Sequence, residues 1–166
     1  MARPAYETAN GLLAAARDAK LDQDSFRQLP GWHAAELLDQ VLDTFTVTGR
    51  GGRMRYWIWE DLRAPSLFLR GGHDLEVLAT LASPSSRAWL IVEDFENAKA
   101  GSPFWIFEGA LSAIAITLRN CHSLEFYVVS RELSWLVGEN HHSAWFAAGE
   151  HAVAALRPMA SADART

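Results

Sequence analysis

Residues 125–150 constrain the fold of this 166-residue chain more than any other stretch. The stretch holds three short apolar runs, each of strand length, at residues 126–129, 135–137 and 144–147. Two polar turns separate the runs. Links this short leave consecutive strands adjacent and antiparallel. The stretch therefore predicts a C-terminal β-meander.

Helical periodicity marks the first third of the chain. From Ala34 to Phe45 the apolar residues take the positions i, i+3, i+4, i+7, i+8 and i+11 of one helix face. A thinner apolar face predicts an earlier helix between Pro4 and Lys20. Asp74 is of the residue type that caps the first free amides of a helix. Similar spacing predicts later helices at residues 74–82, 110–118 and 151–156.

A continuous apolar run, AWLIV at residues 88–92, predicts the centre of the sheet, because a strand buried on both faces has no polar alternation. Residues 54–62 and 66–70 predict further strands, and residues 104–107 predict a strand or the lead-in to a helix.

Together these elements predict an α+β fold with N-terminal helices and a mostly antiparallel sheet of about five or six strands, with helices packed on one face. A chain of this length can enclose one substantial core. We therefore expect a single domain over residues 1–158 and a flexible tail at residues 159–166.

Charge and composition exclude several classes of function. The formal net charge is −5, from 15 Lys+Arg against 20 Asp+Glu. The sequence shows no stripe of positive charge, so nucleic-acid binding is not expected. No apolar window reaches the length of a membrane span, so no membrane partner is expected. Cys121 is the only cysteine, which suits a reducing compartment and predicts a cytoplasmic location. An acidic chain would suit a basic protein partner, and the oligomeric state stays open.

The densest group of reactive side chains is the corner formed by Glu139, Asn140, His141 and His142. In a regular strand, neighbouring side chains point to opposite faces. His141 and His142 would then serve different faces, whereas Glu139 and His141 could serve one site.

Three interpretations of this corner stay open. A metal or catalytic site would join Glu139 and His141 with His151 or with an acid of residues 93–96. A recognition site would use the same side chains to contact a partner or ligand. A structural turn would place Asn140 at positive φ and have a histidine bond the backbone. No metal-binding spacing such as HExxH is present, so we expect no metal and no cofactor.

Other candidate sites are weaker. Glu93, Asp94 and Glu96 follow the central strand, where a solvated turn is the favoured interpretation. Cys121 and His122 are adjacent, so their side chains would diverge in a strand and make a poor nucleophile–base pair. The glycine-rich residues 48–53 lack the strand–loop–helix context of a phosphate-binding loop.

Four segments of the chain carry a resemblance: WLIVEDF, PFWIFEGALSAI, LEFYVVS and LSWLVGENHHSAWFAAGE. Together they resemble a family of small bacterial proteins of unknown function, above all in the WL…ENHH…GE segment from Trp135 to Glu150. The resemblance implies a fold. Proteins of this size and class are similar to immunity proteins, which implies a binding role.

We therefore expect a cytosolic binding protein, immunity-like, that occludes a protein partner. The alternative is a small metal-dependent hydrolase centred on Glu139 and His141. The residues expected to make the binding site are Glu139, Asn140, His141, His142, Trp135 and Trp145.

Overall fold

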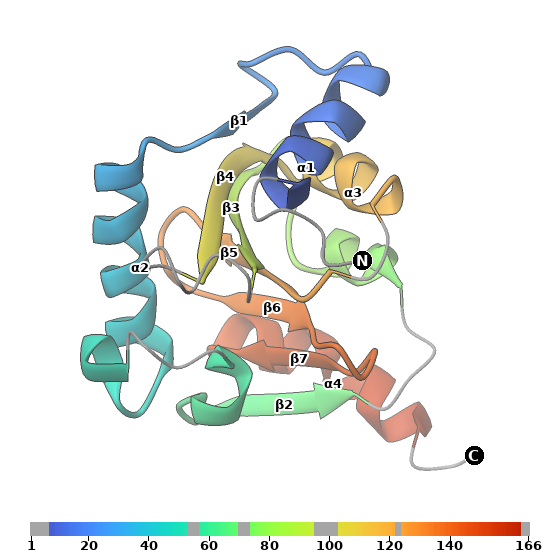
Figure 1. Cartoon of the computed structure of the whole chain (residues 1–166). Helices are drawn as coiled ribbons and strands as arrows, with labels where there is room; N and C mark the ends of the chain where they lie inside the picture. The colour runs from blue at the N-terminus through green and yellow to red at the C-terminus, as the bar shows by residue number, and fades with distance from the viewer. Residues whose placement is uncertain (1–6, 53–56, 70–73, 95–102, 122–123, 164–166) are drawn as a thin grey trace.

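The computed structural model describes residues 7–52, 57–69, 74–94, 103–121 and 124–163 (Figure 1). Its centre is an antiparallel sheet with the strand order β1-β4-β3-β5-β6-β7-β2. The seven strands are β1 (Phe26–Gln28), β2 (Ser66–Leu69), β3 (Arg87–Glu93), β4 (Phe104–Ala110), β5 (Phe126–Ser130), β6 (Leu136–Glu139) and β7 (Trp145–Ala148). The predicted α+β class and the C-terminal meander of β5, β6 and β7 are confirmed.

Strand β3 lies in the interior of the sheet, paired with β4 on one side and β5 on the other. It carries the AWLIV run, in which Leu90, Ile91 and Val92 are fully buried. The predicted position of this run near the sheet centre is confirmed. Its residues are apolar without interruption because side chains on both faces of the strand are covered.

Helices cover both faces of the sheet. One face packs against α1 (Glu7–Asp18), α3 (Leu111–Arg119), α4 (Glu150–Asp163) and the 3-10 helix η3 (Leu75–Thr80). The other packs against α2 (Gly31–Phe45) and the 3-10 helix η2 (Ile58–Asp61). In Figure 1 the sheet separates α2 from α1 and α3.

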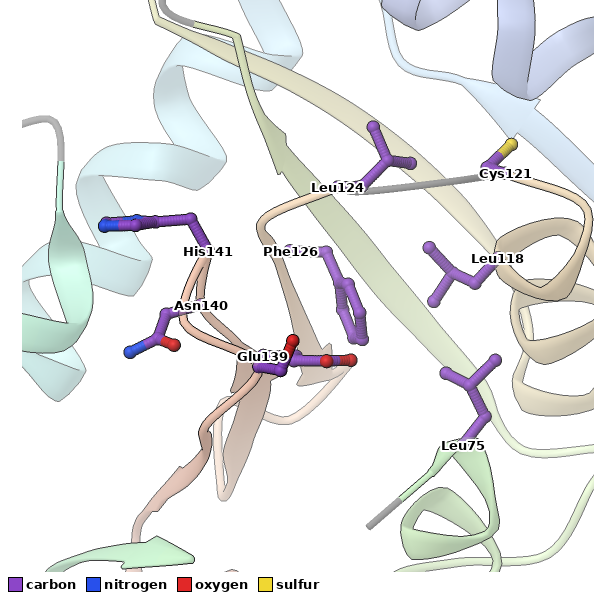
Figure 2. Close-up of a pocket in the computed structure, with 9 residues that line it drawn as sticks. Leu75, Leu118, Cys121, Leu124, Phe126, Glu139, Asn140 and His141 are labelled. Carbon is purple, nitrogen blue, oxygen red and sulfur yellow. The ribbon is translucent and has the colours of Figure 1, made fainter. Parts of the chain in front are cut away.

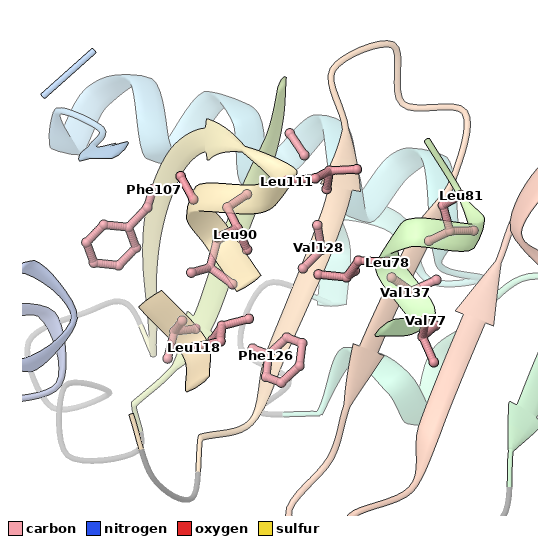
Figure 3. Packing of buried hydrophobic residues seen from close by; sticks show 14 of the residues in the cluster. Val77, Leu78, Leu81, Leu90, Phe107, Leu111, Leu118, Phe126, Val128 and Val137 are labelled. Carbon is pink, nitrogen blue, oxygen red and sulfur yellow. The ribbon is translucent and has the colours of Figure 1, made fainter. Parts of the chain in front are cut away.

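Strand alternation divides the core into two layers. Leu90 and Val128 point toward Leu118 of α3, as Figure 3 shows. Their sequence neighbours Ile91 and Val129 belong to the opposite layer, with the apolar stripe of α2. The prediction of helices on one face is therefore wrong, since α2 covers the second face.

Two strand predictions also need correction. The sheet has seven strands instead of five or six, because the three-residue β1 pairs with β4 at the sheet edge. Residues 58–61, predicted as part of a strand, form the 3-10 helix η2, and the bridge between Thr46 and Leu62 is the one β contact beside it in the described part of the chain. Residues 54–56 of that prediction lie outside the described residues.

The helix predictions agree with the structure apart from their ends. The carboxylate of Asp74 accepts a hydrogen bond from the amide of Glu76 at 2.7 Å and so caps η3 as predicted. Helix α4 continues past residue 158, so residues 159–163 are helical where a tail is predicted. No helix among the described residues has the length and apolarity needed to cross a membrane.

Candidate functional site

The turn between β6 and β7 is built around the side chain of Asn140. Its buried amide oxygen accepts hydrogen bonds from the backbone amides of His142, at 3.0 Å, and Ala144, at 3.1 Å. Ser143 takes the positive φ of the turn, 56°. The expectation of positive φ at Asn140 is wrong. Asn140 stabilises the turn through its side chain instead of forming part of an exposed contact surface.

Glu139 and His141 do not share one site. Glu139 is the last residue of β6, and it borders a pocket on the sheet face that packs against α3. His141 also borders this pocket, but Figure 2 shows its imidazole pointing away from Leu118 and Leu75. The strand ends at Glu139 and the chain then turns, so strand alternation no longer applies to His141.

The partner of His141 is Glu125, which precedes β5. The ring nitrogen Nδ1 of His141 lies 2.8 Å from Oε2 of Glu125, and the backbone amide of His141 donates to the same oxygen at 3.2 Å. The side chain of Glu125 is 5% exposed, whereas that of His141 is 41% exposed. A buried carboxylate thus orients a solvent-accessible imidazole, whose Nε2 atom lies on the far side of the ring.

A second buried acid, Glu93, lies across from Glu125 at the end of β3. Burial, together with a hydrogen bond to Glu125 and the charge of Glu125, raises the pKa of Glu93 to about 10. Both Glu93 oxygens are buried and meet no N–H or O–H donor within the described ranges. A protonated Glu93 resolves this arrangement, because its O–H can donate to the ionised Glu125.

The hydroxyl of Tyr127 completes the buried group. It donates to Oε1 of Glu125 at 3.0 Å, and the backbone of Trp59 hydrogen-bonds to Tyr127 in turn. Burial, followed by the charge of Glu125, raises the pKa of Tyr127 well above its ordinary value. Tyr127 therefore stays a neutral donor, and Glu125 is the charged centre of the group.

The acids after β3 are not in a solvated turn, contrary to the prediction. Glu93 and Asp94 are both buried, and Asp94 accepts a hydrogen bond from Nε1 of Trp105 at 2.9 Å. Glu96 lies outside the described residues. Glu93 belongs to the sheet itself because β3 continues to that residue.

Beside the buried acids lies a group of rings that we call the aromatic–histidine surface: Trp57, Phe68, His141 and His142, which are exposed, and Trp59, which is half-buried. The ring of His141 has its centroid 5.7 Å from that of Trp57 and 6.1 Å from that of Trp59. Trp59 also lies 6.4 Å from His142 and 6.3 Å from Phe68. Trp57 is 37% and Phe68 47% exposed.

Both tryptophans expected at the binding site, Trp135 and Trp145, are buried in the core. Trp145 packs edge-on against Phe126, with the ring centroids 5.6 Å apart. Their role in this fold is to hold the meander against the helices. The exposed aromatic residues are instead Trp57, just before η2, and Phe68 of β2, which neighbour the β6–β7 turn only in the folded chain.

A pocket of about 310 Å³ lies on the other side of the β6–β7 turn (Figure 2). Leu75, Leu118 and Phe126 form its apolar wall, and Glu139 and Cys121 also line it. Burial raises the pKa of Glu139 and of the Cys121 thiol. Cys121 is therefore a poor nucleophile at neutral pH. His122, the base once considered beside it, lies outside the described residues.

Residues 11–160 match a family described as a family of unknown function, DUF6756. The chain belongs to this family. The match spans every residue of the aromatic–histidine surface and of the buried group beneath it, which agrees with the resemblance to an uncharacterised family. No curated protein and no solved structure matches the chain.

The geometry also bears on a metal site for this DUF6756 member. Across the described ranges, no three His, Cys, Asp or Glu side chains come together as metal ligands. Nε2 of His151 lies 2.7 Å from the carbonyl oxygen of Leu81 and thus bonds the backbone. The set of Glu139, His141 and His151 considered for a metal is not assembled.

Proposed function

We propose that this protein binds another protein through the aromatic–histidine surface. The observation that carries the proposal is the placement of exposed rings directly over a buried carboxylate that fixes one of them. Trp57 and Phe68 are exposed, and Trp59 contacts both of them and both histidines. Tryptophan is among the residues that contribute most to the affinity of protein interfaces.

The surface is held in place before any partner arrives. Glu125 holds His141 by two hydrogen bonds, one to the ring and one to the backbone. Trp59 is held through its backbone bond to Tyr127 and by its buried neighbour Ile58. Fixed side chains lose little conformational entropy on binding, which favours affinity.

The charge of the chain supports a basic partner. Glu60 is exposed beside Trp59 in η2, and the chain as a whole carries a formal charge of −5. Complementary charge would speed association and favour a partner with a basic contact surface. We propose that binding here occludes that partner, as an immunity-like protein in the cytoplasm would do.

The proposal is tested with two variants and one control. Partners captured from extract of the source cells are compared, by quantitative mass spectrometry, for wild type, Trp57→Ala and the double variant His141→Ala, His142→Ala. Trp32→Ala is the matched control, because Trp32 is exposed but lies in α2, outside the surface. The binding constant is then measured with the purified partner.

We expect one protein with a basic surface to bind wild type and Trp32→Ala equally, and to bind Trp57→Ala and the double variant at least about tenfold more weakly. The double variant should stay folded, with a loss of about 1–3 kcal/mol of unfolding free energy, because the buried carboxylate of Glu125 loses the His141 ring. Normal binding by Trp57→Ala and the double variant contradicts the proposal. So does a stoichiometric metal that wild type retains and the double variant cannot hold.

A further inference from the structure

A second charged cluster lies at the opposite end of β3 and β4 from Glu93. Its centre is Glu108 of β4, whose side chain is 5% exposed. Three arginines converge on this one carboxylate. Nε of Arg27 donates to Oε1 at 2.8 Å, Nη2 of Arg87 to the same oxygen at 3.2 Å, and Nη1 of Arg131 to Oε2 at 2.9 Å.

The sheet brings these arginines together from three separate segments. Arg27 lies directly opposite Glu108 in the β1–β4 pair. Arg87 begins β3, on the other side of β4, and Arg131 follows the end of β5. All three guanidinium groups are partly exposed. They therefore present a positive surface on a chain whose net charge is negative.

The guanidinium groups are held firmly. Arg87 also donates to the backbone carbonyl of Asp24 at 2.8 Å, and the guanidinium of Arg131 lies 5.2 Å from the centroid of the Trp89 ring. Although burial would raise the pKa of Glu108, the three arginines outweigh it and hold that pKa below its ordinary value. Glu108 thus stays ionised and keeps its partners in place.

The cluster has three positive guanidinium groups and one negative carboxylate, which leaves an excess of two positive charges. A single arginine can satisfy a carboxylate through two parallel hydrogen bonds, yet Glu108 has three. Each guanidinium carries five N–H donors, and within the described part of the chain the bonds to Glu108 and Asp24 use at most two donors on any one arginine. Unused N–H donors and two positive charges in excess of the Glu108 carboxylate are therefore available to solvent around Glu108.

We propose that Arg27, Arg87 and Arg131 form a binding site for a small phosphate monoester. A phosphate ester carries a charge of about −1.5 to −2 at pH 7 and offers three acceptor oxygens, which matches the surplus of two charges. A carboxylate supplies a single charge and would leave the cluster positive. The forked guanidinium groups also suit phosphate geometry. The site is separate from the aromatic–histidine surface and does not depend on the function proposed for it.

The test is a titration of the whole chain with inorganic phosphate, with phenyl phosphate and with acetate, at constant ionic strength and neutral pH. Binding is followed by NMR of the backbone amides and the arginine Nε–H groups. We expect saturable shifts centred on Arg27, Arg87 and Arg131 with both phosphates, and none with acetate. The dissociation constant of phenyl phosphate should be on the order of 1 mM and no weaker than that of inorganic phosphate.

Two variants and a control assign the site. Arg131→Gln should weaken phenyl phosphate binding about tenfold, the effect of losing one charge-assisted hydrogen bond. Glu108 keeps two arginines in this variant, so we expect it to fold. Arg131→Lys retains the charge and loses the fork, and it should also bind more weakly. The control is Arg157→Gln, which replaces an exposed arginine of α4. This variant should bind phenyl phosphate as wild type does.

Three results would overturn the proposal: no saturation up to about 10 mM phenyl phosphate, equal shifts with acetate, or unchanged binding by both Arg131 variants. If Arg131→Gln fails to fold, Arg131→Lys decides alone. Weaker binding by Arg131→Lys supports the site, and unchanged binding overturns it.

Discussion

Glu93 and Glu125 lie side by side at the end of the β3–β5 pair, where the amide of Glu93 donates to the carbonyl oxygen of Glu125 at 3.1 Å. Their carboxyl groups interact in a buried environment where two like charges cannot both persist. Glu93 therefore holds a proton, and Glu125 carries the negative charge that His141 and Tyr127 share. This pair of acids connects the interior strands β3 and β5 to the exposed histidine His141.

Replacing Glu93 with glutamine tests this protonation. Folding raises the pKa of Glu93 from 4.5 to about 10, so the folded protein keeps a proton that the unfolded chain releases. The stability that this proton contributes is complete below about pH 4.5 and declines as pH rises toward 10. Glutamine is neutral throughout. Relative to Glu93→Gln, wild type should lose unfolding free energy steadily as pH rises across this window.

Urea titration of both proteins at several pH values measures this difference. Glu132→Gln, at an exposed position after β5, is the control, and its difference from wild type should stay nearly constant with pH. A constant difference between wild type and Glu93→Gln as well would mean that Glu93 is ionised in the folded protein.

Gly138→Ala should be among the most destabilising changes in the sheet. A methyl group at Gly138 would lie 2.2 Å from the carbonyl oxygen of Phe126 and 2.5 Å from the ring of Phe146. Neither a paired strand nor a fully buried ring can move easily, so we expect a loss of about 3 kcal/mol or more in denaturant titration. At Gly31 the same methyl group meets nothing within 4 Å. Gly31→Ala should therefore change stability by less than about 1 kcal/mol, and an equal loss in both variants would refute the packing argument.

Leu90→Ala removes a fully buried side chain from the interior strand β3. The expected loss of unfolding free energy is about 2–5 kcal/mol, the usual range for such a truncation. Ile116→Ala, at an exposed position of α3, should lose less than about 1 kcal/mol. A loss as small as this at Leu90 would mean that β3 is not at the centre of the core.

Asn140→Ala should weaken the β6–β7 turn, because the amides of His142 and Ala144 lose their acceptor. We expect a loss of about 1–2 kcal/mol and faster hydrogen exchange at these two amides. Asn140→Asp keeps an acceptor oxygen in the same place and should retain most of the stability. If Asn140→Asp loses as much as Asn140→Ala, the side-chain oxygen is not what holds the turn.

Local patterns in the sequence predict much of the fold. The stripe between Ala34 and Phe45 and the AWLIV run predict α2 and β3, because the spacing of apolar residues within each segment already matches the positions that the element buries. The meander follows from three apolar runs joined by turns too short for any other arrangement. By contrast, β1 has three residues and is stabilised by pairing with β4, so its own sequence carries little signal.

The candidate site, like the fold, has features that the local sequence predicts and features that depend on tertiary structure. The sequence by itself determined that a polar corner with two histidines ends a strand of the meander, because the residue types that form turns can be recognised in the local sequence. Only the tertiary structure decided which partners those histidines meet. Glu125 lies 16 residues before His141, and Trp59 comes from a 3-10 helix, with Trp57 just before it, rather than from the predicted strand. Periodicity reports which side of its own element a residue faces, whereas the neighbour across a sheet depends on strand order and on what covers each face.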